Sequence, residues 1–344
     1  MRAVRYDEFR DRPVLVDIPD PVCPPRGAVV SVHATGVCRS DWHAWQGHDD
    51  SVDLPHVPGH EFAGIVDAVG AEVTGFAPGD RVTAPFILAC GRCAQCRAGA
   101  PQVCPDQHQP GFDLPGSWAE KVVVIEADHN LVALPDAIDM TLAAGLGCRV
   151  GTAYHAVRVQ AAVAPGEQVA VFGCGGLGLA CVMVARGAGA EVIAIDVSEH
   201  ALTAAAELGA SVIASGADVA DRVREATGGG AHVTLDALGS AATARSAIGS
   251  LRPRGRHVQV GLLLGEDADP SLPMGRVIGQ ELQILGSHGL AVAEYRELLA
   301  EIASGRLDLG RTVGRLLELE DLPAAMLAMD RPPTTAGMTV ARLR

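Results

Sequence analysis

Four cysteines lie within fifteen residues in the first third of the chain. Cys90, Cys93, Cys96 and Cys104 follow the spacing C-x2-C-x2-C-x7-C. Four thiolates make a complete tetrahedral ligand set for Zn²⁺, and such a site has no open position for a substrate. A disulfide framework and an iron–sulfur cluster are the alternatives. We predict a structural zinc site, because nine cysteines without a secretory signal indicate a reducing compartment, where clustered thiolates are usually metal ligands.

Three further residues of metal-ligating type, Cys38, His60 and Cys148, are scattered along the chain. A catalytic zinc takes three protein ligands and keeps a fourth position open. Each of these residues alone would be interpreted as an ordinary buried cysteine or histidine. Together, and with a dinucleotide-binding pattern downstream, they favour a catalytic metal site assembled between two domains.

The dinucleotide pattern is the stretch VAVFGCGGLG, which contains G-x-G-x-x-G as Gly173, Gly175 and Gly178. It follows a strand-like run and opens an apolar helix, and Asp196 comes after the next strand. The first glycine permits a tight turn, the second lets the backbone approach a pyrophosphate, and the third lets helix and strand pack closely. Asp196 would accept hydrogen bonds from the adenosine ribose and repel a 2′-phosphate, so NAD is favoured over NADP. The alternative is that the glycines only form a turn and Asp196 only caps a helix.

Two different element patterns must position these residues. Up to about residue 150, short β-like runs alternate with glycine and proline turns, which predicts an antiparallel, barrel-like domain. From about 151 to 287, six strand-like runs alternate with helices, which predicts a doubly wound parallel sheet. We expect the first domain to span 1–150 and to be completed by 288–344, with the Rossmann unit, 151–287, inserted between them.

Composition narrows the function. The 344 residues carry a formal charge of −14, which argues against binding to nucleic acid or to an anionic membrane through a broad basic surface. The longest uncharged run, residues 168–185, raises the question of a membrane span, but its four glycines fit a strand, a turn and a buried helix better. The charged N-terminus lacks the apolar core of a signal peptide, so we expect a cytoplasmic protein.

The chain resembles the zinc-dependent medium-chain alcohol dehydrogenases over nearly its whole length. GHEFAGIVDAVGAEV (59–73) matches the family's G-H-E-x2-G-x5-[GA]-x2-[IVSAC] pattern, GDRV (79–82) follows it, and the cysteine block matches the family's structural-zinc lobe. The resemblance implies an α/β protein that combines a GroES-like antiparallel β-barrel catalytic domain with a Rossmann domain. It also makes an iron–sulfur cluster a remote alternative for the four cysteines.

Carried over residue by residue, the resemblance implies two zinc ions per chain. The catalytic zinc would be held by Cys38, His60 and Cys148. Around it, Glu61 would lie beside the metal, Asp41 would orient His60, Ser40 would hydrogen-bond the substrate oxygen, and His43 would continue a proton path to solvent. A turn or helix cap for Ser40 and Asp41, a surface site for His43 and an ordinary ion pair for Glu61 are the structural alternatives.

The resemblance also assigns the cofactor site and the substrate pocket. The residues expected to contact NAD are Arg39, Thr152, Gly173, Gly175, Gly176, Leu177, Gly178, Asp196 and Val260. Phe86 is expected to line the substrate pocket, with Trp42 and Trp45 as weaker candidates that core packing would also explain. Some relatives place an arginine near the C-terminus against the pyrophosphate, but the matching segment here, TTAGMTV, contains none.

These assignments predict reversible hydride transfer between a primary or secondary alcohol and NAD. A polyol or threonine dehydrogenase of the same superfamily is the alternative, although Cys148 stands where such relatives often carry glutamate. A zinc-free quinone reductase would lack the three scattered ligands, and a protein that only stores metal or binds NAD would not need the complete set. A homo-oligomer is expected, with a tetramer favoured over a dimer.

Overall fold

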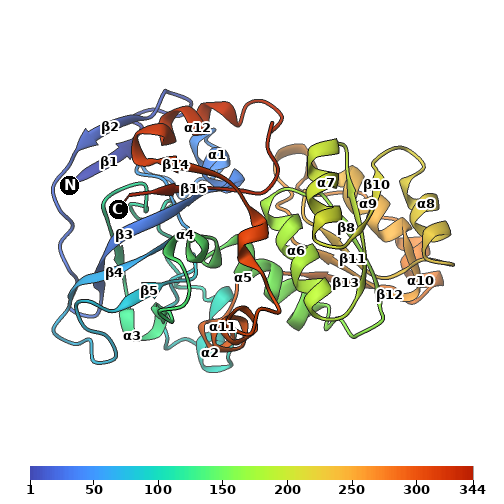
Figure 1. Ribbon diagram of the computed structural model, residues 1–344, viewed down its shortest axis with the longest axis horizontal. Coiled ribbons are helices and arrows are strands. Elements are labelled where there is room, and N and C mark those ends of the chain that lie inside the picture. The colour runs from blue at the N-terminus through green and yellow to red at the C-terminus, as the bar shows by residue number, and fades with distance from the viewer. Residues whose placement is uncertain (344) are drawn as a thin grey trace.

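The computed structural model describes residues 1–343 and contains two large β-sheets, each with its own helices (Figure 1). The first sheet has the strand order β14–β15–β3–β4–β5–β7, and β6 also pairs with β3. Its strands are β3 (Ala28–Val37), β4 (Phe62–Val69), β5 (Arg81–Thr83), β6 (Lys121–Val124), β7 (Val132–Ala133), β14 (Val313–Glu318) and β15 (Met338–Arg342). A separate two-stranded sheet joins β1 (Arg2–Arg5) to β2 (Val14–Asp17).

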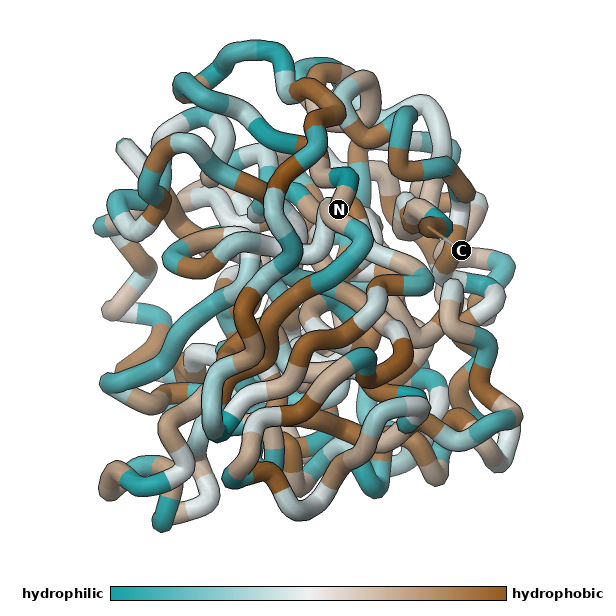
Figure 2. The backbone as a smooth tube through the Cα atoms, turned by 90° about the vertical axis from the view of Figure 1, so that its left-hand side faces the viewer, coloured by the Kyte–Doolittle hydropathy of each residue, from teal (hydrophilic) through white to brown (hydrophobic). Residues whose placement is uncertain are grey.

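Strand β3 organises the first sheet. One of its edges pairs along most of its length with β4, while the other edge is shared, by β6 near its start and by β15 near its end. Val30, Val32, Phe62 and Val82 pack in the core beneath these strands. Figure 2 views this part of the molecule from the side, with hydrophobic segments running through neighbouring strands.

The second sheet is parallel throughout, with the order β10–β9–β8–β11–β12–β13. Its strands are β8 (Gln168–Phe172), β9 (Glu191–Asp196), β10 (Ser211–Ala214), β11 (Ala231–Asp236), β12 (Leu251–Gln259) and β13 (Gln283–Gly286). Successive residues of β8 face opposite sides, as strand geometry requires. Val169 and Val171 join the core under α6 (Gly176–Gly187) and α7 (Glu199–Glu207). Ala170 and Phe172 join the core that contains residues of α8 (Val219–Ala226) and α9 (Ala241–Gly249).

Shorter helices complete the chain. The remaining α-helices are α1 (Arg39–Trp45), α2 (Ala94–Arg97), α3 (Ala127–Asn130), α4 (Met140–Ala143), α5 (Arg149–Tyr154), α10 (Met274–Gly279), α11 (Tyr295–Ala303) and α12 (Leu322–Ala328). Single turns of 3-10 helix are η1 (Pro101–Val103), η2 (Ala144–Leu146), η4 (Gly265–Asp267), η5 (Val292–Glu294), η6 (Leu309–Thr312) and η7 (Leu319–Asp321), and η3 (His155–Gln160) is π-helical.

The structure agrees with the two expected element patterns and corrects one detail. The first sheet is antiparallel except for β14 and β15, which run parallel to each other. Strand β15 pairs with β3, so the C-terminal segment returns to the first sheet, as Figure 1 shows by the red strands beside the blue one. The uncharged run 168–185 forms β8, a turn and the buried helix α6. Within residues 1–343, no helix has the length and apolar character needed to cross a membrane.

Candidate active site and metal centres

Cys38, His60 and Cys148 come together, with their ligand atoms all within 4.8 Å of one another. The topology explains this convergence. Cys38 follows the end of β3, and His60 precedes the start of β4, and these strands pair antiparallel, so the two ends meet. Cys148 immediately precedes α5, where the chain crosses toward the parallel sheet.

His60 is held in the orientation that a metal ligand needs. Its Nδ1 lies 2.8 Å from Oδ1 of the buried Asp41, which can only accept while ionised, so Nδ1 carries a proton and donates it. Nε2 is therefore the ring nitrogen left to bind a metal; it faces the two thiols and is buried without a hydrogen-bond partner in residues 1–343. An orphaned imidazole nitrogen beside two sulfur atoms fits Zn²⁺, which takes nitrogen and sulfur ligands.

Hydrogen bonds and charges within this cluster shift the pKa values of its three residues. Burial alone would lower the pKa of His60, but the charge of Asp41 and its hydrogen bond raise it well above the ordinary value. The hydrogen bond with Cys148 lowers the pKa of Cys38 and raises the pKa of Cys148. The cluster thus favours a thiolate at Cys38, the form in which cysteine binds metal.

Glu61 lies directly behind the cluster in an ion pair with Arg149. Its Oε1 accepts from the backbone N–H of Arg149 at 2.8 Å and from Nε at 3.0 Å, and its Oε2 accepts from Nε at 2.9 Å and from Nη2. Both side chains are buried. Burial raises the pKa of Glu61, and the charge of Arg149 opposes that rise. The pair ties the segment of His60 to the segment of Cys148.

The second cysteine group is a separate cluster. The Sγ atoms of Cys90, Cys93, Cys96 and Cys104 lie within 4.8 Å of one another, and none of the four is in a disulfide. Backbone N–H groups of Cys90, Cys93 and Cys96 each donate to a neighbouring Sγ at 3.4 Å. The hydrogen bond from the Cys96 backbone lowers the pKa of Cys93 to about 7. None of these four residues lines the cleft described next, so the cluster is separate from the Cys38–His60–Cys148 group.

A cleft with a volume of about 1330 Å³ opens between the two sheets and reaches the Cys38–His60–Cys148 cluster. Most of the sequence-predicted site residues line it. They are Cys38, Arg39, Ser40, His60, Phe86, Cys148, Thr152, Gly173, Gly175, Gly176, Leu177, Asp196 and Val260. The cleft therefore unites the candidate metal ligands with the glycine turn.

The glycine turn has the geometry of a phosphate cradle. Gly173 has a φ of +89° at the end of β8, and a Cβ on Gly178 would lie 1.8 Å from the Gly173 carbonyl oxygen, so neither position accepts a side chain. A Cβ on Gly175 would meet no protein atom within 4 Å. Packing within the protein does not require glycine there, whereas the close approach of a pyrophosphate does.

Asp196 and Thr152 line the cleft together with the glycine turn. Asp196, the last residue of β9, accepts from the backbone N–H of Cys174 at 2.6 Å and from that of Ser198 at 2.8 Å. A carboxylate has about four acceptor positions, so it retains capacity for a ribose hydroxyl. The Oγ1 of Thr152 is buried without a partner in residues 1–343 and is free to bond a bound molecule.

Comparison with known proteins agrees with this geometry. Residues 24–136 match the family model "Alcohol dehydrogenase GroES-like domain", and residues 176–304 match "Zinc-binding dehydrogenase". An alcohol dehydrogenase of Geobacillus stearothermophilus is 32% identical over 328 residues, 94% of each chain. A probable D-xylulose reductase A of Neosartorya fischeri is 34% identical over 339 residues, 94% of this chain and 91% of the relative. The solved structure of alcohol dehydrogenase TADH from Thermus sp. ATN1 is 34% identical, covers 100% of both chains, and has a TM-score of 0.91.

The chain belongs to the zinc-type medium-chain dehydrogenase family. The family resemblance and the GroES-like plus Rossmann fold inferred from the sequence are thereby confirmed.

In this medium-chain dehydrogenase the structure corrects the prediction for two tryptophans. Neither Trp42 nor Trp45 lines the cleft. Trp45 is buried in the core of the first domain and donates from Nε1 to the carbonyl of Asp11 at 2.6 Å. Trp42 donates from Nε1 to Asp330 at 2.8 Å. The guanidinium carbon of Arg39 lies over the indole of Trp42, 4.7 Å from the centroid of that ring. Trp42 thus supports the cleft wall from behind.

The predicted proton path is only partly assembled in this structure. Ser40 lines the cleft, and its Oγ lies 3.8 Å from the Sγ of Cys38. His43 is one helical turn further along α1, where its Nδ1 lies 3.1 Å from the Nδ1 of His48. Burial, with a smaller contribution from His48, lowers the pKa of His43 to about 4. No direct hydrogen bond joins Ser40 to His43 in the described part of the chain, so the relay stays a prediction.

Several cleft residues carried no recognisable signal in the sequence. Phe112 lies 5.2 Å from the ring of His60, and His288 packs edge-on against Phe86 at 5.3 Å. Gln109 and Leu262 also line the cleft. These residues lie in loops without periodicity, and only the tertiary fold brings them to the cleft.

Two arginines were also missed. Arg315, on β14, and Arg331, after α12, both line the cleft. Neither forms an ion pair with another residue of the described chain. They provide positive charge to the cleft, to which the segment TTAGMTV contributes no arginine.

Proposed function

We propose that this protein is a zinc- and NAD-dependent alcohol dehydrogenase that interconverts a primary or secondary alcohol with an aldehyde or ketone. The observation that carries the proposal is the convergence of Cys38, His60 and Cys148 at the wall of a cleft that also contains the glycine turn. This arrangement would put a Lewis-acidic metal and a dinucleotide in one cleft. A second metal at the four-cysteine cluster would stabilise the fold without taking part in the reaction.

Each residue then has a role that its position supports. Zinc on Cys38, His60 and Cys148 would supply a Lewis acid that stabilises negative charge on an alcohol oxygen. Asp41 would keep His60 in the ligating tautomer, and Ser40, beside Cys38, would accept the alcohol proton. His43 would pass that proton toward solvent.

The substrate and cofactor walls have separate tasks. Phe86 and Phe112 would hold the carbon chain of the substrate and exclude water near the cluster. Thr152, Leu177 and Val260 would position the dinucleotide ring that exchanges the hydride.

Asp196 supports the preference for NAD over NADP, because its carboxylate would repel a 2′-phosphate. Asp196→Asn keeps one oxygen for the backbone of Cys174 and removes the charge. We expect this variant to lose discrimination against NADP, measured as the ratio of kcat/KM with the two cofactors. An unchanged ratio would contradict the role of Asp196.

A polyol dehydrogenase is the second candidate, because polar side chains join the aromatic ones in the cleft. Gln109, His288 and Asp49 line it, and they could bond additional hydroxyl groups. The D-xylulose reductase relative points the same way. A panel of simple alcohols and polyols, followed by NADH absorbance, separates the two candidates through their kcat/KM values.

Metal analysis tests the common basis of both candidates. We expect about two zinc ions per chain, and Cys38→Ala should lose one of them together with turnover while the protein stays folded. Normal turnover in that variant would refute the assigned catalytic site. A homo-oligomer, with a tetramer rather than a dimer, and a cytoplasmic location remain predictions that light scattering and fractionation would test.

A further inference from the structure

A second pocket, with a volume of about 570 Å³, lies at the end of the parallel sheet where the strands begin, opposite the cofactor cleft. Its residues come from the amino-terminal parts of three neighbouring strands, His232 of β11, Arg252 to Arg256 of β12, and Gln283 of β13. The cofactor cleft, in contrast, is lined by residues at or beyond the carboxyl ends of strands, such as Gly173, Asp196 and Val260. The pocket is therefore distinct from the candidate active site.

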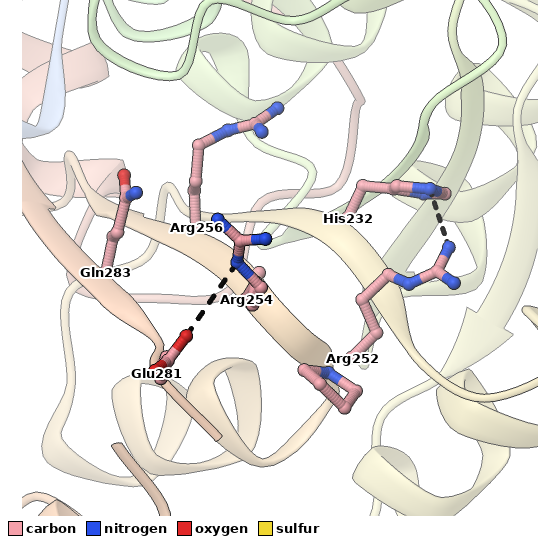
Figure 3. A pocket seen from close by; sticks show the side chains of 8 residues that line it. His232, Arg252, Arg254, Arg256, Glu281 and Gln283 are labelled. Carbon is pink, nitrogen blue, oxygen red and sulfur yellow. Dashed lines mark hydrogen bonds and ion pairs between the residues drawn. The ribbon is translucent and has the colours of Figure 1, made fainter. Parts of the chain in front are cut away.

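The pocket is basic, although the chain as a whole is acidic. Arg252, Arg254 and Arg256 line it, with Glu281 as the only acidic lining residue, although the whole chain has a formal charge of −14. Arg254 and Glu281 are both highly exposed, and their closest ionic atoms are 3.8 Å apart. Such a contact neutralises little, because water screens exposed pairs. Figure 3 shows these side chains around the pocket.

Arg252 and Arg254 lie in a bulge in the pairing of β11 with β12. Between the paired positions Ala231–Leu251 and Val233–Arg256, the single residue His232 stands opposite residues 252–255. Arg254 within this bulge has a φ of +62°, a conformation that costs a non-glycine residue energy. Bulges redirect side chains, and here Arg252 lies against His232 while Arg254 lies near Glu281.

The hydrogen bonds of His232 leave a conflict that an acceptor would resolve. The backbone N–H of Gln168 donates to Nδ1 of His232 at 3.0 Å, so this nitrogen must carry the lone pair and Nε2 must carry the proton. Nε2 lies 2.6 Å from Nη1 of Arg252, which can only donate. Two donors thus face one another, as the dashed contact in Figure 3 marks.

In residues 1–343 the nearby Glu167 carboxylate bonds other donors than these two. It accepts from Nη2 of Arg256 at 2.8 and 2.6 Å and from the backbone N–H of Ala164 at 2.9 Å. The Nε of Arg256 is buried and has no partner in residues 1–343. Burial, followed by the charge of Arg252, lowers the pKa of His232, which agrees with a neutral ring.

We propose that this pocket binds the phosphate group of a small ligand, with one oxygen accepting from both Nε2 of His232 and Nη1 of Arg252. A phosphate offers several acceptor oxygens and a double negative charge, which suits a forked guanidinium beside a neutral imidazole donor. Arg254 adds charge at the exposed rim. The inference does not depend on the proposed alcohol dehydrogenase activity.

Inorganic phosphate is the probe for this site. Its dissociation constant is measured by calorimetry and by the shift in melting temperature, with chloride replacing phosphate at constant ionic strength. We expect stabilisation by phosphate beyond that by chloride, and Arg252→Gln should weaken phosphate binding about tenfold or more, because it removes a charge-assisted bond. His232→Phe should weaken it as well, since it removes the second donor.

Matched controls locate the effect. Arg296→Gln removes one exposed charge from α11, outside both pockets, and should leave phosphate affinity within about twofold. Arg315→Gln alters the cofactor cleft, where phosphate could also bind, and should not remove the stabilisation that depends on Arg252. If Arg252→Gln folds poorly in chloride, Arg252→Lys keeps the charge but loses the fork, and it should bind phosphate with intermediate affinity.

The proposal is overturned by any of three results. The first is an absence of phosphate stabilisation at tens of millimolar beyond that of chloride. The second is phosphate affinity that survives in Arg252→Gln or is lost equally in Arg296→Gln. The third is an oligomer that dissociates when Arg252 is replaced while phosphate has no effect, which would assign the arginines to an interface between copies of the chain.

Discussion

Replacing Asp41 with asparagine tests the candidate catalytic zinc site through a single oxygen atom. Asp41 is fully buried, and both of its oxygens are engaged. Oδ1 accepts from Nδ1 of His60 at 2.8 Å and from the backbone N–H of Gly59 at 3.2 Å. Oδ2 accepts from the backbone N–H of Cys38 at 2.8 Å. The carboxylate thus holds two of the three proposed ligands in place.

Asparagine has nearly the same shape but only one acceptor atom. If its oxygen faces His60, its amino group opposes the N–H of Cys38, and one hydrogen bond becomes a contact between donors. If its oxygen faces Cys38, the amino group opposes Nδ1 of His60, which must then release its proton to Nε2. Nε2 would lose the lone pair that the metal needs.

Both orientations lead to a similar magnitude. A hydrogen bond to a charged group contributes about 1.5–3 kcal/mol. Loss of a group that orients a metal ligand typically lowers metal affinity about 10- to 100-fold, or about 1.4–2.8 kcal/mol. We therefore expect Asp41→Asn to release one of two zinc ions to a chelator at a concentration about 10- to 100-fold lower than the unaltered protein requires.

Chelator competition, followed by zinc analysis of the protein, measures this effect for each zinc separately. Asp139→Asn is the matched control, because Asp139 accepts from the backbone N–H of Thr141 at 2.8 Å at the start of α4 and does not contact the cluster. Because asparagine caps a helix about as well as aspartate, this variant should leave both stability and the two zinc affinities nearly unchanged. Equal zinc retention in Asp41→Asn and the unaltered protein would refute the reasoning.

Three more predictions concern stability and metal content. Arg149→Met would leave the Glu61 carboxylate buried and unpaired, so we expect denaturant unfolding to show a free energy of unfolding lower by about 3–5 kcal/mol. Adding Glu61→Gln should recover part of this loss, and strictly additive losses would show that the pair is uncoupled. Burial would raise the pKa of Glu167, but its bonds with Arg256 lower the value overall, so its stabilisation is present at neutral pH and is lost as the pH falls through the folded-state pKa. Glu167→Gln should therefore melt below the unaltered protein at neutral pH and at the same temperature in acid, and a deficit independent of pH would contradict this. Cys93→Ser should lose the other zinc and lower the melting temperature, and two zinc ions retained per chain would exclude the four-cysteine site.

Short sequence patterns were sufficient to predict the elements whose structure depends mainly on neighbouring residues. The hydrophobic runs of the parallel sheet and its glycine turn are encoded within a few residues, so all six parallel strands lie within the expected range 151–287 and the turn at Gly173 follows β8. The candidate metal ligands could be proposed from the sequence because cysteine and histidine are chemically specific ligand types. In contrast, Phe112 and His288 reach the cleft through loops, whose course depends on contacts that no short segment contains.

The error over the tryptophans has a geometric cause. Residues 39–45 form α1, in which successive side chains are 100° apart, so Trp42 lies about 200° around the helix from Ser40. Ser40 lines the cleft, whereas Trp42 is covered by the guanidinium of Arg39 and bonded to Asp330. His43, about 60° from Ser40, does not line the cleft either, so the position on the helix alone does not decide which side chains reach it.

The arginines of the cleft illustrate a different limit. TTAGMTV contains no arginine, and comparison of that segment alone suggests weaker binding of a pyrophosphate. Strand β14, however, runs parallel to β15, and Arg315 pairs in register with Thr339, so its side chain reaches the cleft from the neighbouring strand. A charge required at one place in space can come from either of two paired strands. The loss of an arginine from one segment is therefore evidence about affinity only after the strand beside it has been examined.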